Sequence, residues 1–317
     1  MRSPTSFAAG LAALVLVAAA CGPGASPSAP SGSAATSQAP ANPSASGAIT
    51  VLPTIVSREL VVGANRVLFS FLDASGTKPV AAPDRTAKVV FRGPNGEVVT
   101  APDGEFIWAI EDVSGVYVTE AEFPTAGVWT AEFTTAAPGA AEETIPFGFE
   151  VLDDAHVVVP GERAPSVDTP TLADVGGDVR QISSDTEPDE AFYETSVADA
   201  LAAGKPFVLA FATPAFCQTQ TCGPTLEKVK SVAATHPDMT FINVEPYKTT
   251  FVDGQLQPEL TAENMLQTVP AADAYGLLSE PFIFVVDGDG KVSASFELIF
   301  TTEEIDAALA ALTEPAR

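Results

Sequence analysis

Two cysteines in the second half of the chain are the residues best suited to chemistry. Cys217 and Cys222 are separated by the four residues Gln-Thr-Gln-Thr. Two thiols at so short a separation can form a disulfide that exchanges with the disulfide or thiols of another protein. They can also form a permanent bridge. The pair is therefore the candidate catalytic site.

The spacing of the pair restricts its geometry. Residues five apart on an ideal helix lie about 7.5 Å apart along the axis and about 140° apart around it, whereas a disulfide needs Cα atoms within about 7 Å. The loop from Cys217 to Cys222 therefore either precedes a helix opened by Gly223-Pro224, or the first helical turn unwinds on oxidation. Both arrangements place a sulfur near a helix N-terminus, which lowers the pKa of a thiol.

The third cysteine, Cys21, ends an apolar leader that begins after Arg2. An apolar run of about 14 residues is shorter than the ~20 that span a bilayer, so residues 1–21 are typical of a secretory signal. The small residues before Cys21 resemble the bacterial lipoprotein cleavage box, although Ala18 stands where that box usually has Leu or Val. The resemblance implies a lipid on Cys21 and a place on the extracytoplasmic face of the cell membrane. The alternative is a plain signal peptide that leaves Cys21 free.

The composition of the chain restricts the classes of partner that it can bind. Residues 22–48 are mainly Ser, Ala, Pro and Gly, a composition that predicts a disordered tether. The formal net charge of -26 argues against nucleic acid, because phosphates must be neutralised by Lys and Arg, and against electrostatic adhesion to an anionic membrane. We expect protein thiols or disulfides as partners, and contact with the membrane through a lipid on Cys21.

The first folded domain is expected over residues 49–154 and is all-β. Short runs with two-residue alternation recur between turn formers, and residues 117, 119, 121 and 123 share one face, as do residues 129, 131 and 133. The sequence pattern of Gly115-Val116-Tyr117 and Gly127-Val128-Trp129 resembles that of bacterial immunoglobulin-like domains, some of which accompany copper proteins. This segment contains no His, Met or Cys, the ligands that copper needs. We interpret the domain as a spacer or a protein-contact module.

The region after the linker at 155–180 resembles the thioredoxin superfamily. An apolar strand over residues 205–213 precedes Cys217, Leu226 and Val229 recur at helical spacing, and a second strand and hairpin follow Pro281. The resemblance implies an α/β thioredoxin-like fold over residues 181–317, with Cys217 and Cys222 catalytic. It also implies that Phe216 and Pro281, a candidate cis-proline, border the substrate groove. The expected fold class is thus two domains, an N-terminal all-β immunoglobulin-like sandwich and a C-terminal α/β thioredoxin-like fold.

Three departures limit what this resemblance implies about activity. The family motif is Cys-x2-Cys, Phe216 replaces the usual Trp, and the acidic residue of the preceding strand is replaced by Ala210 or Phe211. The identity of the attacking thiol stays open. One alignment makes Cys217 the nucleophile and Cys222 the resolving thiol, whereas another makes Cys222 the nucleophile with Thr225 in its partner's position.

Other chemistries fit less well. The spacing of Pro214 from Cys217 does not match a peroxiredoxin. His236 suits a helix end better than a copper site, and the acidic turn at residues 287–290 lacks the ligands of a calcium loop. We expect no metal and no cofactor. The hypothesis is a membrane-anchored, extracytoplasmic thiol-disulfide oxidoreductase; the alternative is a surface binding or scaffold lipoprotein that is catalytically silent, because Cys217 and Cys222 form a structural disulfide in its thioredoxin-like fold.

Overall fold

The computed structural model describes residues 49–312, which belong to one compact unit. The predictions of a signal peptide at 1–21, a lipid on Cys21 and a tether at 22–48 lie outside the described residues. Within residues 49–312, no helix is both long and apolar enough to cross a membrane.

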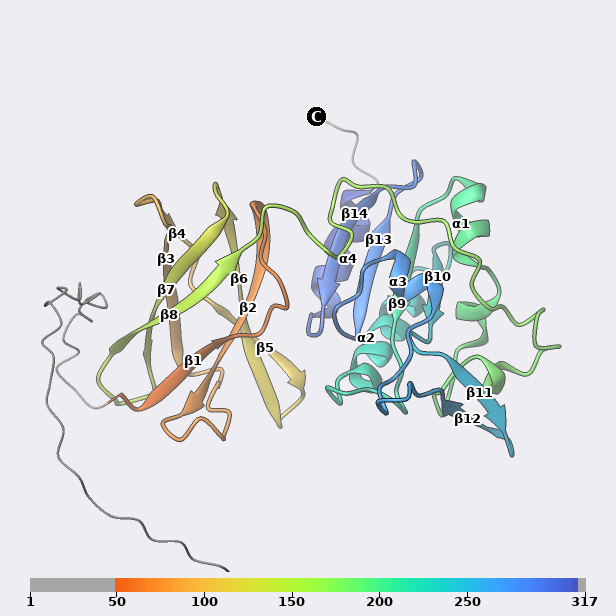
Figure 1. The fold of residues 1–317 in the computed structure, drawn as a ribbon, viewed down its shortest axis with the longest axis horizontal. Coiled ribbons are helices and arrows are strands. Elements are labelled where there is room, and N and C mark those ends of the chain that lie inside the picture. The colour runs from red at the N-terminus through yellow and green to blue at the C-terminus, as the bar shows by residue number, and fades with distance from the viewer. Residues whose placement is uncertain (1–48, 313–317) are drawn as a thin grey trace, which may run out of the picture. The chain divides into compact units, whose positions relative to one another are not determined.

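The first half of the described chain is a β-rich sandwich that resembles an immunoglobulin-like domain (Figure 1). All of its strand pairs are antiparallel. One sheet has the order β1(Val51–Ile55), β2(Gly63–Asp73), β6(Ser114–Phe123) and β5(Glu105–Ile110). The other has the order β4(Val98–Thr100), β3(Thr86–Arg92), β7(Gly127–Ala136) and β8(Glu143–Val151).

Alternating side chains fill the space between these two sheets. In β6 and β7 the faces predicted from the sequence are buried, including Tyr117, Phe123, Trp129 and Phe133. The rings of Phe69 and Phe133, from opposite sheets, lie 5.0 Å apart between centroids. In β7 and β8 buried residues alternate with more exposed ones, as in a sheet that buries one face. The other sheet is also buried on its outer face, where Leu68, Ile107 and Val116 pack with Leu298 and Ile299.

The second half contains a mixed four-stranded sheet of the order β10(Thr240–Val244), β9(Phe207–Phe211), β13(Phe282–Val286) and β14(Val292–Glu297). Strands β9 and β10 are parallel, whereas β13 is antiparallel to both β9 and β14. A separate hairpin joins β11(Thr249–Val252) and β12(Gln255–Pro258). The helical segments are η1(Val179–Gln181), η2(Glu190–Tyr193), α1(Val197–Ala203), α2(Cys222–Thr235), α3(Pro270–Ala274) and α4(Thr302–Ala311).

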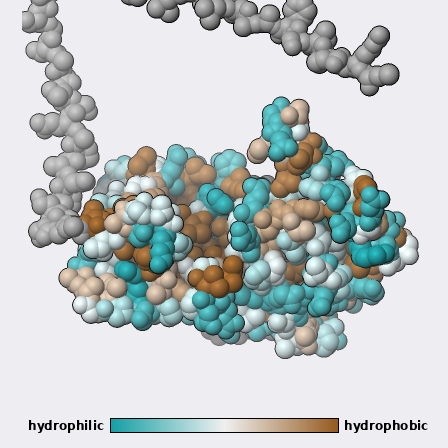
Figure 2. All heavy atoms as spheres, turned by 90° about the horizontal axis from the view of Figure 1, so that it is seen from below, coloured by the Kyte–Doolittle hydropathy of each residue, from teal (hydrophilic) through white to brown (hydrophobic). Residues whose placement is uncertain are grey.

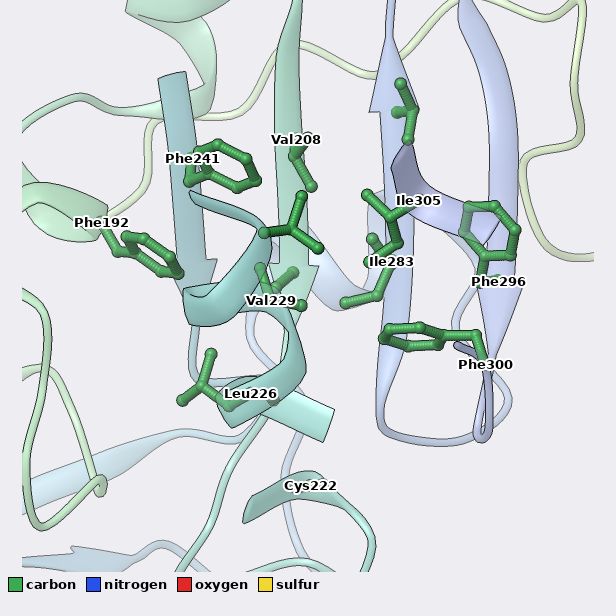
Figure 3. Close-up of a cluster of buried hydrophobic side chains, with 14 of the residues drawn as sticks. Phe192, Val208, Cys222, Leu226, Val229, Phe241, Ile283, Phe296, Phe300 and Ile305 are labelled. Atoms are coloured by element: carbon green, nitrogen blue, oxygen red, sulfur yellow. The ribbon is translucent and has the colours of Figure 1, made fainter. Parts of the chain in front are cut away.

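Helices α2 and α4 pack on one face of this sheet through a shared apolar core (Figure 3). Leu226 and Val229 of α2 lie over β9, and Ile305 of α4 belongs to the same cluster. A capping box begins α4, because Thr301 accepts the N–H of Glu304 and Glu304 accepts the N–H of Thr301. The α2 helix is therefore anchored along its apolar stripe, and its first residue, Cys222, is buried in that core.

The expected fold class is wrong. The described chain is predominantly β, with 38% of its residues in strands and 16% in helices, spread over four sheets, and no thioredoxin α/β pattern is evident. The physical reason lies in the helices: α1 has 7 residues and α3 has 5. Long stretches around them form turns and irregular backbone instead. The part of the expectation that is confirmed is a β-rich fold that resembles an immunoglobulin-like domain.

Hydrophilic and hydrophobic residues are mixed on the surface. Figure 2 shows hydrophilic residues over much of the face seen from below, with hydrophobic residues lying between them. Individual apolar side chains such as Val113 and Val128 are exposed, at 74% and 71%. Scattered exposed residues of this kind are normal on a folded protein.

Candidate thiol site

The two cysteines lie on either side of the N-terminus of α2. Strand β9 ends at Phe211 and α2 begins at Cys222, so that Cys217 lies in the loop between them. This is the first of the two arrangements allowed by the spacing, a loop that precedes the helix. Both cysteines are free; Cys222 is fully buried, whereas Cys217 is part-buried. The backbone N–H of Cys222 donates to Sγ of Cys217 at 3.2 Å.

Thr219 organises the loop that holds Cys217. Its hydroxyl oxygen lies 3.3 Å from Sγ of Cys217 and 2.7 Å from the hydroxyl of Thr221. It also donates to the carbonyl oxygen of Glu280 at 3.2 Å. Gln220 adopts a positive φ of 62°, a conformation that favours Gly or Asn and occurs at tight turns. The loop therefore curls back so that Cys217 faces the first turn of α2.

The environment shifts the pKa values of the two thiols in opposite directions. A hydrogen bond from the Cys222 thiol, supported by the Thr219 hydroxyl, lowers the pKa of Cys217 to about 5, although burial opposes this shift. The pKa of Cys222 is raised, first by its hydrogen bond to Cys217 and then by burial. Cys217 is therefore the thiol that ionises first, and its position at a helix N-terminus agrees with this direction.

A buried carboxylate, Glu280, faces the loop from the other side. Its side chain is 4% exposed. One carboxylate oxygen accepts the N–H of Gln218 at 2.8 Å, and the other accepts the hydroxyl of Tyr247 at 2.6 Å. The peptide bond from Glu280 to Pro281 is cis, and Pro281 is buried. The structure therefore brings Glu280, the residue before Pro281, against the loop that carries Cys217.

The other residues singled out in the sequence lie as follows. Phe216 is part-buried directly before Cys217, and its N–H donates to the carbonyl oxygen of Thr213 at 3.2 Å. Ala210 and Phe211 are fully buried in β9. His236 caps the end of α2 and lies 3.0 Å from Asp306.

Further along the chain, the acidic turn expected at 287–290 is a hairpin turn. Asp287 accepts the backbone N–H groups of Asp289 and Lys291. Its carboxylate is thus used within the turn itself.

Sequence reasoning missed Glu280, Tyr247 and Thr219. Glu280 carried a weak signal, because it directly precedes the proline that the sequence singled out. Tyr247 carried none, since nothing near it in the sequence connects it to the cysteines. A second buried carboxylate, Glu245, accepts the N–H of Ser184 at 2.6 Å, and burial raises its pKa to about 7.

Three groups at this site have the chemistry of metal ligands. The two sulfur atoms of Cys217 and Cys222 and a carboxylate oxygen of Glu280 lie within 4.8 Å of one another. The sequence predicted no metal. In the structure both thiols are free, and the carboxylate of Glu280 lies close to them.

Comparison with known proteins adds little to this description. No family model matches the chain, and no curated protein matches it. Among solved structures, it is similar to a DUF4426 family protein from Pseudomonas aeruginosa PAO1, with a TM-score of 0.24 and 13% sequence identity. The similarity covers 29% of this chain and 68% of that chain.

Proposed function

We propose that this chain is a thiol-disulfide oxidoreductase whose reacting groups are Cys217 and Cys222. The observation that carries the proposal is the contact between the N–H of Cys222 and Sγ of Cys217, at 3.2 Å. It joins a part-buried thiol, which a partner protein can reach, to a fully buried one. This asymmetry is what a nucleophilic thiol and a resolving thiol require.

The proposed reaction has two exchange steps, written here in the reducing direction. The Cys217 thiolate attacks one sulfur of a partner disulfide, so that a mixed disulfide forms and the other partner sulfur leaves as a thiolate. Cys222 then loses its proton and attacks Sγ of Cys217. The Cys217–Cys222 disulfide forms, and the partner's second sulfur leaves as a thiolate. Two electrons pass to the partner, and its two thiolates take up the two protons released by the cysteines.

Phe216, which is part-buried and directly precedes Cys217, supports a role for the surface beside Cys217 in binding the partner's chain. We propose further that the protein works outside the cytoplasm, held at the membrane by a lipid on Cys21. An oxidising compartment is where a dithiol pair of this kind finds disulfide partners. The partners are then proteins with exchangeable thiols or disulfides.

Trapping of the mixed disulfide tests the proposal. In full-length protein carrying Cys21→Ser, Cys222→Ser removes the resolving thiol, so a partner stays bound to Cys217 as a mixed disulfide visible on non-reducing gels. The matched variant Cys217→Ser traps none. If the pair forms a purely structural bridge, neither variant traps a partner, and the reduction potential of the pair lies below about -300 mV. That outcome would contradict the proposal.

A further inference from the structure

The reduced thiol site also holds a set of metal ligands, made up of the two thiols that the exchange reaction uses and a carboxylate that it does not need. Sγ of Cys217, Sγ of Cys222 and a carboxylate oxygen of Glu280 lie within 4.8 Å of one another, although they come from a loop, the start of α2 and the segment that leads into β13. In a tetrahedral zinc site with bonds of about 2.0–2.3 Å, neighbouring ligand atoms lie about 3.5–3.8 Å apart. A small approach of the three groups would therefore complete such a geometry.

The surroundings of Glu280 match those of a metal-binding carboxylate. Both of its oxygens are already oriented, one by the N–H of Gln218 and the other by the hydroxyl of Tyr247. Ligating carboxylates typically accept hydrogen bonds of this kind from groups outside the metal's own ligand set. The N–H of Cys222 orients the sulfur of Cys217 in the same way.

Charge at the site also favours a cation. Glu280 is 4% exposed, yet within residues 49–312 no Lys, Arg or His forms an ion pair with it. Arg58 lines a cavity of about 170 Å³ together with Glu280, without pairing with it. A buried carboxylate without a cationic partner is costly, and deprotonated thiols beside it would add negative charge. A bound cation offsets this charge.

We propose that the reduced protein binds one Zn²⁺ ion through Cys217, Cys222 and Glu280. Two thiolates and one carboxylate suit this borderline-soft ion, whereas calcium and magnesium prefer oxygen ligands throughout. Both thiols release their protons when the metal binds. Because Cys217 is part-buried, the fourth position of the tetrahedron is open to water or to a partner ligand. The metal site does not depend on the proposed exchange activity, although both use the same thiols.

Cobalt substitution tests the site directly. Co²⁺ is added to reduced, metal-free, full-length protein carrying Cys21→Ser, so that the pair supplies all the thiols. We expect one equivalent to bind and to give thiolate-to-cobalt charge-transfer absorption in the near ultraviolet. Zn²⁺ should displace it with loss of the band. Cys217→Ser and Cys222→Ser should each weaken or abolish the absorption.

Glu280→Gln distinguishes a three-ligand site from adventitious binding to two thiols. This variant keeps the shape of the side chain, and we expect a loss of Zn²⁺ affinity on the order of 10–100-fold. Glu245→Gln removes another buried carboxylate and should leave the affinity unchanged; circular dichroism checks that both variants fold. Equal Zn²⁺ affinity in wild type and Glu280→Gln would overturn the proposal, as would the absence of charge-transfer absorption while both thiols titrate as free. Since none of these readouts measures disulfide exchange, the metal site can fail while the proposed function stands, and the reverse.

Discussion

The hydroxyl of Tyr247 donates a 2.6 Å hydrogen bond to the carboxylate of Glu280. Glu280 is the residue directly before the buried Pro281. Gln218 joins the same arrangement, because its side-chain amide donates to the Tyr247 hydroxyl at 3.1 Å. The loop that carries Cys217 is therefore fastened to Glu280 and Tyr247 by side chains that are not themselves thiols. The position of the reactive sulfur thus depends on residues far from it in the sequence.

Removal of the Tyr247 hydroxyl should destabilise the fold. In Tyr247→Phe, one oxygen of the buried Glu280 loses its donor, which costs about 1–3 kcal/mol of unfolding free energy. Chemical denaturation measures this loss. Tyr275→Phe is the matched control, since the Tyr275 hydroxyl is buried and has no hydrogen-bond partner among residues 49–312. Its removal should leave stability unchanged or raise it, and equal destabilisation by both variants would contradict the account of Glu280 given above.

The two thiols should differ sharply in alkylation. In reduced, metal-free protein, iodoacetamide should modify Cys217 at pH 6, because its pKa is lowered to about 5 and its side chain is part-buried. The fully buried Cys222 should react only on unfolding. Mass spectrometry of the peptides, with denatured protein as the control, measures both rates. Faster modification of Cys222 than of Cys217 would reverse the assignment of nucleophile and resolving thiol.

The stability that Glu245 contributes to the fold should fall as the pH rises from about 4.5 to 7. Burial raises its folded-state pKa from 4.5 to about 7, so the folded state holds the proton more tightly than the unfolded state. The resulting stability is fully present below pH 4.5 and is lost as the pH rises through 7, a change of about 3 kcal/mol for a shift of this size.

Glu245→Gln should remove this part of the pH dependence. Denaturation curves of wild type and variant at pH 4.5 and pH 8 measure it, and we expect the variant to gain stability relative to wild type at the higher pH. The exposed Glu150 provides the matched control, since Glu150→Gln should leave the pH profile unchanged. A parallel pH profile for Glu245→Gln and wild type would show that Glu245 ionises normally in the fold.

Cys21 should determine where the protein resides. If it carries a lipid, the full-length chain made in a bacterium fractionates with membranes, and Cys21→Ser releases it into the soluble fraction or leaves the leader uncleaved. The matched change Cys217→Ser should not alter fractionation. Identical membrane association of wild type and Cys21→Ser, with the leader cleaved from both, would exclude a lipid anchor at this residue.

Local patterns in the sequence predicted local structure well. The alternation around Tyr117 and Trp129 predicted the buried faces of β6 and β7, and the helical spacing of Leu226 and Val229 predicted a helix where α2 lies. The fold class was wrong because it extended a resemblance around the cysteines to a whole α/β domain. The short helices α1 and α3, and the balance of strand over helix, depend on how the intervening segments pack.

By itself, the sequence determined that two thiols lie five positions apart after an apolar strand, and that they cannot pair within one helix. Periodicity and spacing act between near neighbours, so they can be seen in the chain alone. The tertiary structure decided that the loop precedes α2, that Cys222 is the buried thiol, and that Glu280 joins the pair. Glu280 lies 62 residues beyond Gln218, to which it is hydrogen-bonded. Burial and contacts across such a distance arise when the strands and helices assemble, and no local pattern encodes them.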